Sequence, residues 1–149
     1  MVKIDSFRGA HRFLSNFHST PVTLDGVTYH SAEAAFQASK TLDPTRRAEY
    51  AAVKNPLVVK RMGRREQLRP DWEQVAYDVM GQVVRAKFAD SELARQLLDT
   101  GDALLVEGNR WHDNRWGSCS CQRCSGVQGQ NWLGRILMEV RDELRGKEV

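Results

Sequence analysis

The sequence has no long apolar segment and no sign of a targeting segment, an internal repeat or a linker. No run of apolar residues approaches the roughly 20 that a helix needs to cross a bilayer. The first five residues lack the apolar stretch of a signal peptide. We therefore expect a cytoplasmic protein without a membrane partner, in which residues 1–149 form one domain.

Cysteine is scarce, and all three cysteines lie close together, at Cys119, Cys121 and Cys124. A disulfide framework would spread its cysteines along the chain to close large loops. The cluster is therefore either a metal site or a set of reduced thiols. A closed zinc site needs four ligands, usually cysteine or histidine, and His112 is the nearest candidate for the fourth.

A strong excess of charge is also lacking, because the formal net charge is only +3. This value is compatible with an anionic substrate, whereas a dedicated nucleic-acid binder carries a basic stripe. Pairs of cations such as Arg46-Arg47 and Arg64-Arg65 are interpreted as solvated helix surface. The charge therefore argues against a small nucleic-acid-binding protein whose cysteine loop is a zinc knuckle.

Local signals predict an α+β fold, a mainly helical domain with a small sheet or hairpin. Asp25-Gly26 lies between alternating apolar residues and predicts a β-hairpin over residues 22–29, because both positions tolerate a positive φ. Further strands are expected at 2–7 and 103–107, and a long loop over 108–130. Capping residues and apolar periodicity predict helices over 31–40, 44–54, 56–62 and 71–88, after Asp90, and from 131 to 144.

The predicted helix that Ser31 caps carries two side chains capable of chemistry. Glu33 lies in the first turn, where the helix dipole favours an ionised carboxylate. Lys40 follows seven residues later, on nearly the same face and about 10 Å along the axis. From this pattern alone, Glu33 is a partner of the helix dipole and Lys40 is a solvated cation at the helix end.

Several motifs occur in a set order along the chain. They are FLSNF at 13–17, SAEAAFQASK at 31–40, RMGR at 61–64, Trp72, RAKF at 85–88, LVE at 105–107, DNRWG at 113–117 and GQNWLGRILMEVR at 129–141. In this order and spacing they resemble the NADAR family, also called YbiA-like, across nearly the whole chain. The resemblance implies the fold of that family and an N-glycosidase that accommodates ribose-phosphate ligands such as ADP-ribose.

The resemblance implies two activities. One removes ADP-ribose from ADP-ribosylated guanine in DNA or RNA, as the antidote to a toxin that attaches the group. The other cleaves ribosylamino intermediates of riboflavin synthesis. Both break a bond between ribose C1 and nitrogen, so we expect an N-glycosyl hydrolase, with the first substrate as the leading hypothesis. A module that binds ADP-ribose or NAD without turnover is the alternative from a different class.

The resemblance also assigns catalytic roles. Glu33 and Asp113 match acidic positions of the family. One carboxylate stabilises positive charge on the sugar, and a second transfers a proton or activates a water. Lys40 can form a Schiff base with the opened sugar, with Glu33 as its acid–base partner, and water then resolves it. We favour this route over direct attack by water. Trp72 matches an aromatic position that could stack on a base.

Other matched positions are predicted to bind substrate. The set is Asn16, Phe36, Trp72, Trp116, Gly117, Gly129, Asn131, Leu133 and Gly134. Glycine lets backbone amides approach phosphate, and the amides at the start of the last helix could face an anion. Core packing is an equal alternative for Trp116 and Leu133, and Gly134 could simply permit close helix packing.

The cysteines interrupt the family pattern as a loop insertion over about 117–128. A zinc staple on Cys119, Cys121, Cys124 and His112 and a loop of free thiols are the two alternatives. The family chemistry requires no cofactor, so zinc here is expected to be structural and not catalytic.

Overall fold

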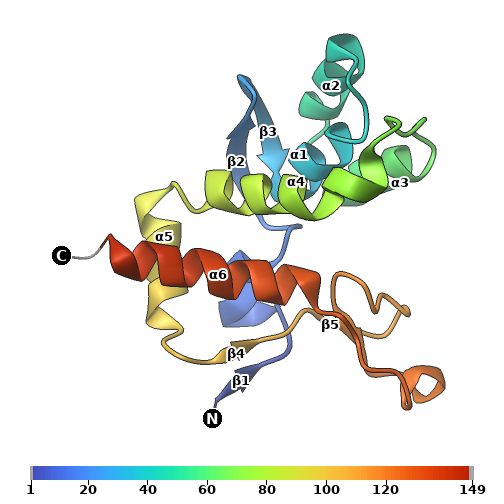
Figure 1. Ribbon diagram of the computed structural model, residues 1–149. Coiled ribbons are helices and arrows are strands. Elements are labelled where there is room, and N and C mark those ends of the chain that lie inside the picture. Colours follow the sequence, from blue (N-terminus) through green and yellow to red (C-terminus); the bar gives the residue numbers. More distant parts are fainter. Residues whose placement is uncertain (1, 148–149) are drawn as a thin grey trace. The chain divides into compact units, whose positions relative to one another are not determined.

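The computed structural model describes residues 2–147, so Met1 and residues 148–149 of the predicted domain lie outside it (Figure 1). The chain forms two compact units, one of Asn16–Asp90 and one of Met1–Ser15 with Ser91–Val149. Their helices and small sheets confirm the predicted α+β class. Among residues 2–147, no helix is long and apolar enough to span a membrane.

The unit of residues 16–90 begins with the predicted hairpin. Strands β2 (Ser19–Leu24) and β3 (Val27–Ser31) pair antiparallel. The turn residues Asp25 and Gly26 adopt φ values of 51° and 80°. Both values lie in the left-handed region that a two-residue hairpin turn requires, so the physical basis of the prediction is confirmed.

Four helices complete this unit: α1 (Ala32–Ala38), α2 (Pro44–Ala51), α3 (Pro56–Arg64) and α4 (Trp72–Lys87). Three of them start at the predicted capping residues. The side chains of Ser31, Asp43 and Asn55 each accept a hydrogen bond from a backbone N–H in the first turn of the helix that follows. These bonds satisfy N–H groups that have no partner within the helix.

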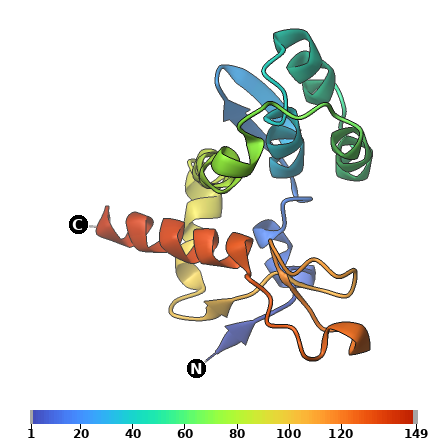
Figure 2. The same ribbon diagram turned by 45° about the vertical axis from the view of Figure 1, so that its right-hand side comes forward.

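Helix α1 is the centre of this unit and is shorter than predicted. It contacts both strands and the other three helices, and all seven of its residues are buried. It ends at Ala38 and does not reach Lys40, because the N–H groups of Lys40 and Thr41 bond to carbonyls three residues back, those of Gln37 and Ala38, and no longer four residues back. A helix this short is unstable alone, so its packing holds it in place. In Figure 2 it lies among the other helices of the unit.

The second unit is built on a long C-terminal helix. Its elements are β1 (Lys3–Ile4), the 3-10 helix η1 (Gly9–Leu14), α5 (Ser91–Asp99), β4 (Leu104–Leu105), β5 (Gly108–Asn109), β6 (Ser118–Cys119), η2 (Gln122–Cys124) and α6 (Trp132–Gly146). Helix α6 packs against α5 and β4. Strands β1 and β4 pair in parallel, as do β5 and β6 (Figure 1).

The predicted strands of this unit were too long. Both predicted strands, 2–7 and 103–107, contain only two paired residues each, at Lys3–Ile4 and Leu104–Leu105. The pairing joins segments about 100 residues apart, Lys3–Ile4 with Leu104–Leu105, so neither segment could reveal its length by local alternation. The predicted loop 108–130 contains two short strands and η2, and η1 was not predicted. Elements this short leave no periodic pattern.

Candidate active site

Glu33 is a buried carboxylate in the first turn of α1. Only 7% of its surface is exposed. The Gln37 Nε2 donates to Glu33 Oε1 at 2.9 Å, and the Glu33 backbone N–H donates to the carbonyl oxygen of Asn16 at 3.0 Å. Burying a carboxylate is costly unless it is hydrogen-bonded. The surroundings of Glu33 therefore hold its side chain in one position.

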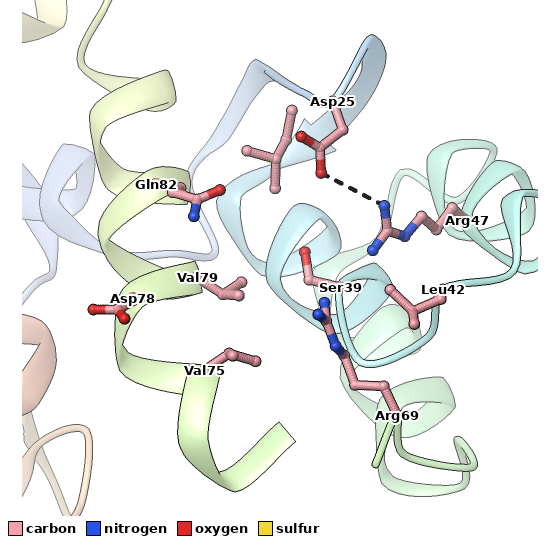
Figure 3. Close-up of a pocket in the computed structure, with 10 residues that line it drawn as sticks. Asp25, Ser39, Leu42, Arg47, Arg69, Val75, Asp78, Val79 and Gln82 are labelled. Carbon is pink, nitrogen blue, oxygen red and sulfur yellow. Dashed lines mark ion pairs between the residues drawn. The ribbon is translucent and has the colours of Figure 1, made fainter. Parts of the chain in front are cut away.

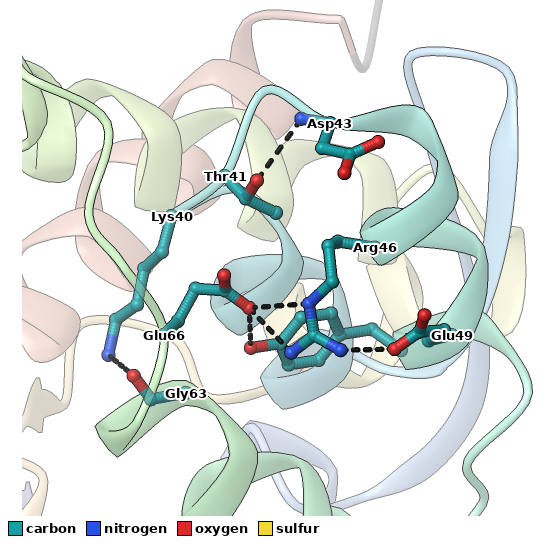
Figure 4. Close-up of polar contacts among 8 residues, drawn as sticks. Lys40, Thr41, Asp43, Arg46, Glu49, Gly63 and Glu66 are labelled. Carbon is teal, nitrogen blue, oxygen red and sulfur yellow. Dashed lines mark hydrogen bonds and ion pairs between the residues drawn. The ribbon is translucent and has the colours of Figure 1, made fainter.

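Lys40 lies two residues beyond the end of α1 and is half-buried. Its Nζ donates to the carbonyl oxygen of Gly63 at 3.4 Å (Figure 4). Burial has the largest effect and lowers the pKa of Lys40. The charges of Glu33 and Glu66 raise this pKa, and the charge of Arg64 lowers it. The resulting pKa lies below the ordinary lysine value. A lower pKa leaves more of the lysine as the free amine, which is the nucleophilic form.

Three further predicted residues belong to the same unit. Asn16 is buried, and its Nδ2 lies 3.5 Å from the sulfur of Met80. The rings of Phe36 and Trp72 lie 5.2 Å apart at 53°, and each residue is only 6% exposed. This unit therefore contains Asn16, Glu33, Phe36, Lys40 and Trp72, with the aromatic pair packed in its core.

Two residues of this site were not assigned from the sequence, Gln37 and Gly63. Gln37 is four residues after Glu33, a spacing at which glutamine and an acidic residue meet on a helix, so the signal was available. A Cβ on Gly63 would lie 1.8 Å from Gln37 Oε1, which shows how closely α3 approaches α1 here. No local signal marks Gly63, because the close approach involves a residue 26 positions away.

We expect Gly63→Ala to disturb Glu33 more than it disturbs the fold. The new methyl group displaces the Gln37 amide from Glu33. Overpacking costs about 1–3 kcal/mol, and the better helix propensity of alanine offsets about 1 kcal/mol. Urea unfolding measures the net change. Gly146→Ala is the matched control, since a Cβ there meets nothing within 4 Å. Equal unfolding free energies and equal activities for both variants would contradict this prediction.

An anion with a buried side chain, Glu66, lies beside Lys40 in Figure 4. The Tyr50 hydroxyl donates to Glu66 Oε1 at 2.7 Å, and Arg46 Nη2 does so at 2.8 Å. Burial raises the pKa of Glu66, but hydrogen bonds from Arg46 and Tyr50 lower it by more. Burial also raises the pKa of Tyr50, which therefore stays protonated and donates. The network keeps Glu66 ionised, so its charge acts on Lys40.

A polar pocket of about 400 Å³ lies elsewhere in this unit (Figure 3). Its lining includes Arg47 and Arg69, but each arginine is already paired, with Asp25 at 3.5 Å and with Asp71 at 2.6 Å. None of the residues predicted from the sequence to bind or react lines this pocket. Because carboxylates neutralise its cations, we do not assign the pocket to an anionic substrate.

Asp113 lies in the other unit, in the loop between β5 and β6, and is half-buried. Its Oδ1 accepts hydrogen bonds from the N–H groups of Arg115 and Trp116 at 3.1 and 2.9 Å. Its backbone N–H and carbonyl both bond to the Asn109 side chain, at 3.1 and 2.8 Å. Asn109 therefore positions Asp113, a role that the sequence did not reveal.

The start of α6 is bonded to the loop before it. The N–H groups of Trp132 and Leu133 donate to the carbonyls of Arg115 and Trp116, each at 3.0 Å. The prediction that an anion binds here is therefore wrong for the N–H groups of Trp132 and Leu133, because loop carbonyls already accept their hydrogen bonds. The Asn131 side chain also bonds within the chain, donating to Leu105 O at 2.9 Å and accepting from Glu107 N at 3.0 Å.

The glycines predicted to bind substrate lie at close backbone approaches. A Cβ on Gly134 would lie 2.2 Å from Leu105 O, and one on Gly117 would lie 2.1 Å from Glu107 O. Gly129 is similarly crowded by the backbone of residues 117 and 118. These contacts explain the glycines by packing, so a role in binding stays a prediction.

The other two predicted residues in this unit also make packing contacts. Trp116 is half-buried and meets Trp132 edge to face, with ring centroids 5.3 Å apart at 88°. Leu133 is only 4% exposed. The packing alternative therefore accounts for Leu133, and substrate binding by either residue stays a prediction.

The cysteines form a cluster with His112. The ligand atoms of His112, Cys119, Cys121 and Cys124 all lie within 4.8 Å of one another, an arrangement that could hold a metal ion. All three cysteines are free of disulfides. Burial raises the pKa of the Cys119 thiol, but the neighbouring donors, beginning with the Cys121 N–H, lower it to about 6.

The fold and these side chains define a small α+β protein with a buried carboxylate and a lysine of lowered pKa in one unit. Residues 6–145 match the NADAR domain, and the chain belongs to this family. N-glycosidase YbiA of Escherichia coli (strain K12) is 41% identical over 133 residues, which is 87% of this chain and 79% of that protein.

A solved structure and a longer relative extend the comparison. The NMR structure of the E. coli protein YbiA has a TM-score of 0.83 and 37% identity, and the match covers 99% of this chain and 89% of that one. Riboflavin biosynthesis protein VVA0006 of Vibrio vulnificus (strain YJ016) is 36% identical over 138 residues, which is 91% of this chain but 36% of that protein.

Proposed function

We propose that this NADAR-domain protein is an N-glycosidase that hydrolyses the bond between C1 of a ribose phosphate and a base nitrogen. The observation that carries the proposal is the combination of a buried Glu33 carboxylate with a lysine whose pKa is lowered by burial. Several relatives are named N-glycosidases, and these names support the same reaction class.

The proposed reaction uses Lys40 as a nucleophile. The lone pair of Nζ adds to ribose C1, the bond from C1 to the base nitrogen breaks, and the base leaves with a proton from Glu33. The bond from C1 to the ring oxygen then breaks, the ring oxygen takes a proton from Nζ and becomes a hydroxyl, and C1 is held as a protonated Schiff base. Water then adds to C1 while Glu33 takes up its proton, and the free sugar and amine are restored.

The remaining residues take supporting roles in this proposal. Asp113 stabilises positive charge at C1, and its carboxylate is held in place by loop N–H groups. Trp72 and Phe36 pack against each other and are each 6% exposed, and this small exposed part is the apolar surface proposed to contact the base. Asn16 helps to hold the ligand beside Glu33. The carbonyl oxygen of Asn16 already accepts a hydrogen bond from the backbone N–H of Glu33. No cofactor takes part in the proposed reaction.

Two substrates fit this reaction class. ADP-ribosylated guanine in DNA or RNA is our leading choice, from the family resemblance of the motifs around Glu33, Lys40 and Asp113. A ribosylamino pyrimidine phosphate is the alternative, and one observation favours it: two relatives are named riboflavin biosynthesis proteins. Both substrates are anionic and present ribose C1 bonded to nitrogen.

The test is to incubate purified protein separately with an ADP-ribosylated guanine oligonucleotide and with a ribosylamino pyrimidine phosphate. Mass spectrometry follows the loss of the sugar from each. We expect the first substrate to lose its ADP-ribose and to regenerate the unmodified base. Cleavage of the second alone would move the protein to the metabolic class. Binding of ADP-ribose with no cleavage of either would overturn the proposal in favour of a binding module.

A further inference from the structure

Four side chains in the segment between β5 and α6 converge on one point. The His112 Nδ1 lies 3.3, 3.4 and 3.9 Å from the sulfur atoms of Cys121, Cys124 and Cys119. His112 lies in the loop after β5, Cys119 in strand β6, Cys121 at the N-cap of the 3-10 helix η2, and Cys124 within η2.

These distances match the geometry of tetrahedral zinc. Zinc binds sulfur at about 2.3 Å and nitrogen at about 2.0 Å, so a tetrahedral arrangement separates nitrogen from sulfur by about 3.5 Å. The three observed distances lie on either side of that value. We propose that His112, Cys119, Cys121 and Cys124 bind one zinc ion in a closed structural site.

The surroundings of the cluster orient its ligands. The Asn114 Nδ2 donates to the sulfur of Cys124 at 3.4 Å, while its Oδ1 accepts from the Cys119 N–H at 2.9 Å. The Cys121 N–H donates to the sulfur of Cys119 at 3.4 Å. Hydrogen bonds of this kind stabilise metal-bound thiolates and fix the direction of each ligand. Asn114 is therefore assigned as a positioning residue of the site.

His112 adopts a backbone conformation that a ligand would explain. Its φ is 68°, in the left-handed region that non-glycine residues rarely occupy. Such a conformation costs on the order of 1–3 kcal/mol and persists only where the surrounding structure enforces it. Here it turns the imidazole toward the three sulfur atoms. A bond from Nδ1 to zinc offsets that cost.

The ligand set favours zinc in a structural role. Thiolate and imidazole ligands suit zinc, whereas magnesium and calcium require oxygen ligands. Four protein ligands leave no open position for a water or a substrate, as in structural zinc sites. The segment has little regular structure of its own, with strands of two residues and a single turn of η2. Zinc binding is therefore expected to supply much of its folding free energy.

The first measurement is the zinc content of protein produced in zinc-supplemented medium, together with the absorption spectrum after replacement by cobalt(II). We expect about one zinc per chain, and cobalt bands typical of tetrahedral coordination with thiolate charge transfer. Fewer than about one-tenth zinc per chain, with no tetrahedral cobalt bands, overturns the proposal. Neither readout depends on the enzymatic reaction.

Variants then identify the ligands. His112→Asn keeps a residue that tolerates positive φ but removes the imidazole, and His30→Asn is the matched control at an exposed histidine. We expect His112→Asn to release zinc to a chelator at least about tenfold more readily than wild type, and His30→Asn to release it as wild type does. Equal release from both variants overturns the assignment of His112.

Hydrogen exchange locates the effect of the metal and does not require a variant to fold. We expect chelation of zinc to accelerate amide exchange in residues 108–124 of the wild-type protein, while the hairpin β2–β3 is unchanged. Unchanged exchange in 108–124 after complete removal of the metal overturns the structural role.

Discussion

We expect Glu33→Gln and Lys40→Ala each to abolish measurable N-glycosidic cleavage while the protein stays folded. Loss of a general acid–base group lowers rates by about 10²–10⁴-fold, and loss of the nucleophile is expected to cost at least as much. Glutamine at position 33 retains an oxygen that can accept from Gln37, so the fold around α1 is preserved. Lys54→Ala is the matched control, because Lys54 is an exposed lysine of the same unit.

Reduction with borohydride separates the lysine route from direct attack by water. If Lys40 forms a Schiff base, reduction during turnover leaves the sugar bonded to Nζ, and peptide mass spectrometry finds the added mass at Lys40. We then expect no borohydride adduct on Lys40→Ala, and the same adduct on Lys54→Ala as on the wild-type protein. Near-normal turnover by Lys40→Ala, with no adduct on the wild-type protein, would eliminate the lysine route and leave Glu33 to activate water.

We expect the burial of Lys87 to make the stability of the protein increase with pH. This residue of α4 is 1% exposed, its Nζ lies 5.2 Å from the centre of the Phe88 ring, and burial lowers its pKa to about 7. In the unfolded chain the pKa is near the ordinary 10.5. Between these values the unfolded state binds a proton that the folded state does not. The free energy of unfolding therefore rises with pH, by up to about 1.4 kcal/mol per pH unit.

Lys87→Met isolates this contribution, because methionine is similar in length and does not titrate. We expect the free energy of unfolding of wild type to rise relative to Lys87→Met between pH 7 and pH 10, and the difference to be constant below pH 7. Urea unfolding at a series of pH values measures it. Lys54→Met, at an exposed lysine, should follow wild type. Parallel pH profiles for wild type and Lys87→Met would show that Lys87 is charged in the folded protein above pH 7.

Lys87 also provides an internal comparison for Lys40. Both lysines have a pKa lowered by burial, but Lys40 is half-buried and Lys87 is almost completely buried. A nucleophile must reach its substrate, so a lowered pKa alone does not identify one. We therefore expect borohydride trapping at Lys40 and none at Lys87.

The local elements were predictable from the sequence because their causes are local. The turn at Asp25-Gly26 and the caps at Ser31, Asp43 and Asn55 depend on residues a few positions apart, and the structure shows each of them. The ordered motifs identified the family for a similar reason, since residue types and spacing are written directly in the chain. The proximity of His112 to the cysteines was also foreseen, because all four belong to one short segment.

Only the tertiary structure decided the properties that depend on distant segments. The pairing of β1 with β4, the approach of Gly63 to Gln37 and the bonds from the α6 amides to the loop carbonyls join residues that no local pattern connects. The lowered pKa values of Lys40 and Lys87 likewise arise from burial. Burial results from the packing of the whole unit, and for this reason the sequence led to the proposal of Glu33 and Lys40 as reactive residues while the fold determined the lowered pKa of Lys40.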